Sequence, residues 1–171
     1  SGCSGIDGTI TIHEGSTTID NGAFAGTSAK NIIVSENNEK YFSDDGILYA
    51  YAGGVYNSQT LLCCPAGRTK PVELAEGTAE IESYAFYGCD KIGDSMIFPE
   101  TIKRISSRAF WNSSITKIYA KGKAPSSWCS PSPFDNENLI IYYEPGMTGW
   151  EEWAEYHGVT AIENSCKSGI N

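Results

Sequence analysis

The sequence predicts a mainly β solenoid of short strands, with an inserted β-hairpin and a short C-terminal capping helix. The phrase Ile-x-x-x-Ala-Phe begins at Ile81 and recurs at Ile105. An earlier copy begins at Ile19, and the N-terminal segment can be laid without a gap on the segment that follows Gly88, apolar on apolar. A fixed period of about 24 residues is typical of a stack whose units bury their apolar faces only against their neighbours.

Each unit supplies a short strand in which apolar and polar residues alternate, the pattern of a strand with one buried face. We expect these strands at residues 9–12, 32–34, 72–74, 96–98, 118–120 and 139–141. The residues between the inward positions should form an exposed ladder: Thr11, Ile33, Glu73, Ile97, Tyr119, Ile140 and Tyr142. Solenoids use such extended surfaces for binding.

One repeat carries an insertion at residues 36–71. The spacing between Phe24 and Phe86 exceeds one period by roughly the length of this segment. Asp44-Asp45-Gly46 predicts a turn, and residues 47–51 and 60–64 predict the two strands of a hairpin. The insertion is either a binding element, which adds Tyr49 and Tyr51 to the candidate surface, or a shield for a weakly paired strand edge.

The C-terminal residues 144–166 should cap the stack. A degraded fourth copy precedes them, with Phe134 one period after Phe110, Cys129 in place of a core isoleucine and Pro133 in place of alanine. Thr148 and Glu151 have the spacing of a capping box, and Gly158 is a natural helix end. Between them, one helical face carries Trp150, Trp153, Ala154 and His157. These tryptophans either cover the core or form an exposed aromatic site.

The charge balance limits the classes of partner. The chain has 12 basic and 21 acidic residues, a net charge of −9, which argues against nucleic acid and anionic membranes. It has no apolar run long enough for membrane insertion.

Among its six cysteines, Cys3 and Cys89 hold equivalent inward positions, and Cys63 and Cys64 should point to opposite faces. We expect free thiols; if one pair is oxidised, Cys166 is the first candidate because it lies outside the repeats.

The sequence offers no catalytic, metal or cofactor motif. His13 lies in a predicted turn and His157 at a helix end, where a surface histidine is the simplest interpretation. Cys63-Cys64 lacks zinc-ligand spacing, Asp44-Asp45-Gly46 is too short for a calcium loop, and no Gly-Lys-Ser/Thr follows Gly53-Gly54. We therefore expect no enzyme; the one enzymatic alternative is a hydrolase site between hairpin and solenoid.

The segments IESYAFYGC and MIFPETIKRISSRAF resemble the BspA-like leucine-rich repeats of bacterial surface proteins. YFSDDGILYA, TLLCCPAGR and LIIYYEPGMTGW are similar to the family's inserted and closing segments. The resemblance implies a leucine-rich-repeat solenoid at the cell surface or outside the cell, which binds a protein or glycan and has no enzymatic activity. It carries over no site residue.

These observations give an expectation for the whole chain. Residues 1–171 should form a single domain, an excerpt of a longer protein. The first hypothesis is a non-enzymatic adhesion protein that binds host or neighbouring-cell macromolecules. The alternative is a spacer that presents another domain of a larger surface protein.

Overall fold

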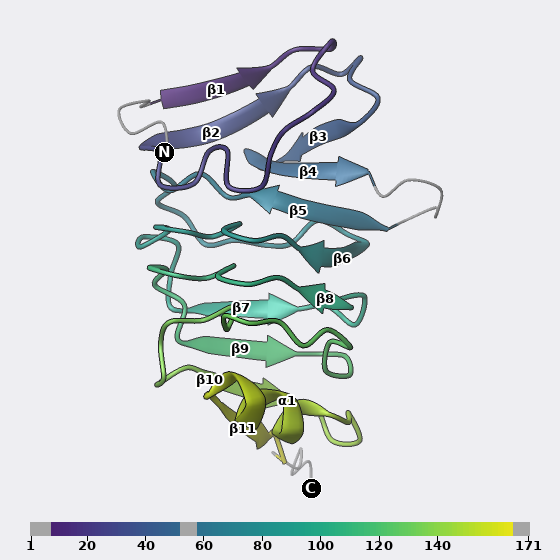
Figure 1. Ribbon diagram of the computed structural model, residues 1–171, viewed down its shortest axis with the longest axis vertical. Helices are drawn as coiled ribbons and strands as arrows, with labels where there is room; N and C mark the ends of the chain where they lie inside the picture. Colours follow the sequence, from purple (N-terminus) through teal and green to yellow (C-terminus); the bar gives the residue numbers. More distant parts are fainter. Residues whose placement is uncertain (1–7, 52–57, 166–171) are drawn as a thin grey trace, which may run out of the picture.

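The computed structural model describes residues 8–51 and 58–165, which form a solenoid stacked along one axis from β1 at the top of Figure 1 to α1 and β11 at the bottom. The mainly β repeat fold predicted from the sequence is confirmed. The described residues form eleven strands and one helix: β1 (Gly8–Ile12), β2 (Ala29–Val34), β3 (Tyr41–Asp44), β4 (Ile47–Tyr51), β5 (Gln59–Cys63), β6 (Thr78–Ile81), β7 (Ser95–Phe98), β8 (Arg104–Ile105), β9 (Lys117–Ala120), β10 (Ile140–Tyr143), α1 (Trp150–His157) and β11 (Thr160–Glu163).

The strands form three sheets. One pairs β1 with β2, the second has the order β11-β10-β9-β7, and the third has the order β3-β4-β5-β6-β8. Neighbouring coils pair in parallel, so that equivalent residues of successive repeats stand beside one another, as with Met96 and Ile118. Because side chains alternate between the two faces of a strand, this register buries one row from every coil and exposes the next.

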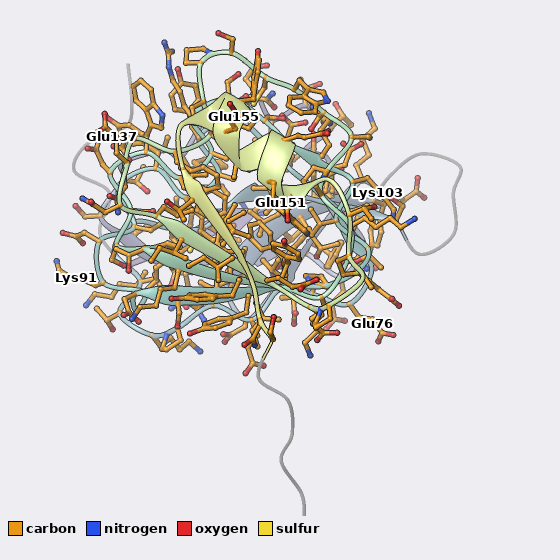
Figure 2. All side chains as sticks on the ribbon, turned by 90° about the horizontal axis from the view of Figure 1, so that it is seen from below. Glu76, Lys91, Lys103, Glu137, Glu151 and Glu155 are labelled. Atoms are coloured by element: carbon orange, nitrogen blue, oxygen red, sulfur yellow. The ribbon has the colours of Figure 1, made fainter. Side chains whose placement is uncertain are left out.

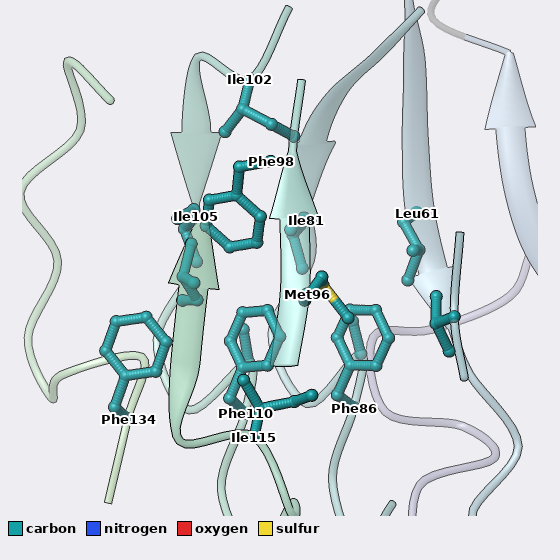
Figure 3. Close-up of a cluster of buried hydrophobic side chains, with 14 of the residues drawn as sticks. Leu61, Ile81, Phe86, Met96, Phe98, Ile102, Ile105, Phe110, Ile115 and Phe134 are labelled. Carbon is teal, nitrogen blue, oxygen red and sulfur yellow. The ribbon is translucent and has the colours of Figure 1, made fainter. Parts of the chain in front are cut away.

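The Ala-Phe phrases form the corners of the coils. The rings of Phe86 and Phe110 stack with centroids 4.8 Å apart, and those of Phe110 and Phe134 stack 5.3 Å apart, as Figure 3 shows. The backbone N–H of Phe86 donates to the carbonyl of Ala109, and that of Phe110 donates to Pro133. The degraded fourth copy therefore packs as the sequence predicts.

The prediction of a strand at residues 72–74 is wrong. Val72 is buried and Glu73 is exposed, but the segment joins no sheet. Pro71 has no N–H to donate to a strand partner. The carbonyls of Lys70 and Pro71 instead accept hydrogen bonds from the Arg68 guanidinium, so a side chain replaces the strand pairing there.

The insertion is built into the stack, because its strands share one sheet with β6 and β8 of the following coils. The predicted hairpin of β4 and β5 is confirmed, and β3 adds a third antiparallel strand. Asp45 and Gly46 turn the chain between β3 and β4 with positive φ at both residues, the geometry of a type I′ turn. On its other side β5 pairs with β6, and this pairing builds the insertion into the stack.

Strand β4 is buried on both faces, which overturns the prediction that Tyr49 belongs to an interaction surface. Ile47 and Tyr49 pack into the larger hydrophobic cluster, whereas Leu48 packs with Ile12 and Ile32 in a smaller one. Tyr49 is fully buried, and its hydroxyl accepts a hydrogen bond from the N–H of Ala75. Burial raises the pKa of Tyr49 to about 12.

The cap covers the end of the core, as the end-on view shows, with Glu151 and Glu155 on the helix and the other labelled charged side chains at the periphery (Figure 2). Trp150 and Trp153 are buried, and their indole N–H groups donate to the carbonyls of Gly122 and Ser127. The alternative of an exposed tryptophan site is therefore wrong. Gly158 ends the helix in a left-handed conformation, as predicted. Strand β11 then returns beside β10.

The capping box predicted at Thr148 and Glu151 is also wrong. Gly149 stands at the N-cap with φ +88°, and no side chain caps the helix. The Glu151 carboxylate instead accepts a hydrogen bond from the hydroxyl of Tyr143, which lowers the pKa of Glu151 and raises that of Tyr143 to about 12.

The described cysteines are free thiols. Cys63 packs into the smaller cluster and Cys64 into the larger one, which confirms that the two point to opposite faces. Cys89 is buried as predicted, and burial raises the pKa of Cys63. Cys3 and Cys166 lie outside the described residues.

Candidate interaction surface

Four coils place one large apolar or aromatic side chain each in a straight exposed row. The register pairs Ile97 of β7 with Tyr119 of β9, Tyr119 with Tyr142 of β10, and Tyr142 with Ile162 of β11. We call these four residues the aromatic row. With parallel strands about 4.8 Å apart, three steps make the row about 14 Å long.

The aromatic row is exposed and internally ordered. The exposed fractions of Ile97, Tyr119 and Ile162 are 55%, 41% and 42%, and Tyr142 is half-buried. The rings of Tyr119 and Tyr142 stack at 5.3 Å with an angle of 16° between their planes. Because the two rings already restrain each other, they would lose little conformational freedom on contact with a partner.

A mostly polar row runs beside it along the same strands. Three of its members are polar, Ser95, Lys117 and Thr160, and the fourth on the same register line is Ile140. The ammonium of Lys117 lies 2.9 Å from the carboxylate of Asp94. This hydrogen bond lowers the pKa of Asp94 and raises that of Lys117. The strand face thus combines an apolar stripe with a mostly polar border, as protein interfaces do.

The other predicted surface residues do not join the aromatic row. Thr11 and Ile33 pair with each other on β1 and β2 and face outward, but that sheet is separate. The unpaired segment with Glu73 borders a hollow of about 380 Å³ that residues of β7, Ile97 among them, also line. Tyr51 is exposed on the third sheet, stacked on Phe42 at 4.7 Å.

Ile162 is the member of the row that sequence reasoning missed. Residues 159–163 alternate, with Thr160 and Ile162 outward and Val159 and Ala161 packed on the core. That alternation is the signal for a strand. The repeat pattern does not point to it, because the Ala-Phe phrase does not recur after Phe134.

The described residues contain no cluster of three or more histidine, cysteine or acidic residues able to hold a metal ion, and none of their helices is both long and apolar enough to cross a bilayer. His13 is exposed beside a turn, as predicted. His157 is buried, so the prediction of a surface histidine there is wrong.

His157 packs its ring against Trp153, with centroids 4.2 Å apart. Neither of its ring nitrogens has a hydrogen-bond partner, and burial lowers its pKa to about 4. The helix C-terminus therefore holds a neutral imidazole rather than the cation that its position suggested.

The repeat pattern of the BspA type leucine rich repeat region matches residues 1–45 and 65–139 in six copies. The chain belongs to this family. No curated protein matches the chain. The crystal structure of a leucine rich cell surface protein from Faecalibacterium prausnitzii A2-165 is similar over 94% of this chain and 48% of its own, with 19% identity and a TM-score of 0.60.

A second similar structure is that of a leucine-rich repeat protein from Eubacterium ventriosum ATCC 27560. It matches 91% of this chain and 48% of its own at 17% identity, with a TM-score of 0.53. This BspA-type chain therefore spans about half the length of either neighbour. At these identities the two structures show the fold alone.

Proposed function

We propose that this BspA-type chain is a non-enzymatic adhesion segment that acts outside the cell or at its surface. It binds an extracellular protein through the aromatic row. The observation that carries the proposal is the in-register, exposed line of Ile97, Tyr119, Tyr142 and Ile162 across four coils. The cell-surface description of the F. prausnitzii neighbour supports the location.

The row has the features of a protein-binding face. Tyrosine is enriched at binding hot spots, where a rigid ring supplies a large contact area. A stripe of four side chains that extends over about 14 Å, with a mostly polar border, fits an extended polypeptide or a strand face better than a small molecule, which a compact concave site would hold. The net charge of −9 favours a neutral or basic protein partner over an acidic one.

The test is Tyr119→Glu, measured by binding of the purified chain to a panel of immobilised extracellular-matrix proteins. The glutamate would bring a charge into the contact with the partner, where it would be buried. Binding should weaken at least tenfold, since losing a hot-spot tyrosine costs about 2 kcal/mol or more of binding free energy. Tyr156→Glu is the matched control, because Tyr156 is similarly exposed but lies on α1.

Circular dichroism would verify that both variants are folded. Unchanged binding by folded Tyr119→Glu would exclude the row as the site. If the unmodified chain binds no protein of the panel, a spacer that presents another domain becomes the better interpretation.

A further inference from the structure

The Ala-Phe corners of three repeats enclose a second feature, a surface hollow of about 330 Å³. Its residues lie in three turns, at residues 21–26, 83–88 and 107–112, and none lies on a strand of the aromatic row; the second and third turns follow β6 and β8. The hollow is lined by Asn21, Gly22, Ala25, Tyr84, Tyr87, Arg108 and Trp111.

The hollow exists because equivalent positions of the repeats differ in size. The residue before the Ala-Phe pair is Gly22 in the first repeat, Tyr84 in the next and Arg108 in the one after. The residue after that pair is Ala25, then Tyr87, then Trp111. The first repeat thus leaves open the space that the next two surround with aromatic and cationic side chains.

Tyr84 and Arg108 occupy a backbone conformation that suits glycine. Their φ angles are +64° and +59°, close to the +74° of Gly22 at the same corner. Bulky residues rarely adopt this left-handed region, and such outliers cluster at ligand sites. Neither side chain is part of the hydrophobic core, so packing does not explain why the corners carry them.

Arg108 is a cation without a carboxylate partner among the ion pairs of the described residues, in contrast to Arg68 and Arg104. Its guanidinium carbon lies 4.9 Å from the ring centre of Trp111 and 5.8 Å from that of Tyr84. One terminal nitrogen donates to the Tyr84 hydroxyl at 2.6 Å, while the buried Nε has no partner.

These features select a ligand that carries both a carboxylate and a flat apolar face. A guanidinium binds a carboxylate through paired hydrogen bonds. The aromatic rings of Tyr87 and Trp111, which line the hollow, suit the weakly positive C–H groups of a sugar ring. The volume is at the lower end of the roughly 300–1,000 Å³ of small-molecule sites, which fits one or two sugar rings.

We propose that this hollow binds an acidic sugar residue, a uronic or sialic acid, of an extracellular glycan. An extended peptide fits less well, because peptides are held mainly by backbone hydrogen bonds to a sheet edge and the lining residues lie in corner turns. The site is independent of the aromatic row and stands or falls separately from it.

The experiment is calorimetric titration of the whole chain with two probes, a sialic-acid-terminated trisaccharide and a glucuronic-acid-terminated tetrasaccharide. Each is compared with its carboxyl-reduced form. We expect saturable binding of at least one acidic probe, at least tenfold tighter than its reduced form. The loss of affinity on carboxyl reduction would show that the carboxylate is recognised.

Arg108→Gly should abolish this binding without lowering the thermal midpoint, because glycine adopts the left-handed backbone freely. Should that variant be less stable, Arg108→Asn provides the same test, since asparagine tolerates this conformation. Lys123→Gln is the charge-matched control at an exposed site and should bind like the original chain.

Three results would overturn the proposal. These are equal affinity for acidic and reduced sugars, binding that survives Arg108→Gly, and no saturable binding of either acidic probe at millimolar concentration. Tighter Arg108-dependent binding of a short glutamate-rich peptide than of either sugar would instead assign the hollow to an acidic peptide. Binding of matrix proteins through Tyr119 is unaffected by any of these outcomes.

Discussion

Arg68 is only 2% exposed and donates four hydrogen bonds, to the backbone carbonyls of Asp45, Lys70 and Pro71 and to the Asp45 carboxylate. The arginine thereby ties the tip of the insertion to the unpaired segment that follows it. Hydrogen bonds from Lys70 and from Arg68 lower the pKa of Asp45. Removing this buried guanidinium would break all four hydrogen bonds at once.

We predict that Arg68→Met lowers the free energy of unfolding by about 2–4 kcal/mol, because it removes four hydrogen bonds made by a guanidinium that is itself buried. Urea denaturation measures the loss. Lys70→Met is the matched control, since its pair with the same carboxylate is solvent-exposed and should contribute less than about 1 kcal/mol. Equal losses in the two variants would contradict this role for Arg68.

His157 should make stability depend on pH. Burial lowers its pKa in the folded protein to about 4, whereas the pKa of histidine in the unfolded chain is about 6.5. The unfolded state therefore binds more protons between these values, and stability is lost as the pH falls from about 6.5 to 4. At about 1.4 kcal/mol per pKa unit the loss is on the order of 3 kcal/mol.

Replacing His157 by phenylalanine retains a ring against Trp153 and removes the titrating group. The variant should lose less stability than the original chain between pH 7 and pH 4, as measured by urea titrations at each pH. Acidic residues contribute equally to both proteins, so the difference isolates the histidine. Parallel pH profiles would exclude it as the cause.

At the scale of elements, the start of α1 shows how a loop and a helix are joined. Gly149 takes the left-handed N-cap position, and the Thr148 carbonyl accepts a backbone hydrogen bond from Ala124. A Cβ at Gly149 would lie 3.3 Å from the Ala124 side chain. The direction of entry into the helix is therefore set by glycine backbone freedom rather than by a side-chain cap.

This start predicts unequal effects for two neighbouring substitutions. Gly149→Ala should lower the free energy of unfolding by about 1–2 kcal/mol through left-handed strain. Thr148→Ala should change it by less than about 0.5 kcal/mol, although loss of a true capping box would cost about 1 kcal/mol. Thermal unfolding followed by near-ultraviolet circular dichroism of the tryptophans measures both. A loss of about 1 kcal/mol in Thr148→Ala would instead support the capping box that the sequence predicted.

At the scale of the whole molecule, the fixed period predicted the stack because the same apolar positions meet their own copies in the next coil. That logic also placed Ile97, Tyr119 and Tyr142 outward, since alternation in a strand follows from backbone geometry alone. The prediction from alternation failed where segments pack on both faces of a strand, because alternation alone does not show that the second face is covered. Tyr49 alternates like an exposed residue, but both faces of β4 are covered.

The hollow at the corners could have been located by reading the variable positions down the repeats instead of the apolar ones. Gly22, Tyr84 and Arg108 share one position. Their change from glycine to large side chains is visible in the sequence. The strained backbone and the unpaired guanidinium are not, because they depend on how three coils are spaced.

The doubly buried strand β4 divides the interior into two compartments that share one wall. A substitution that changes the volume on the Leu48 side is absorbed by residues of the first coils, and one on the Tyr49 side by the longer stack beyond. We therefore expect a change of core volume on one side of β4 to leave the packing of the other compartment largely unchanged.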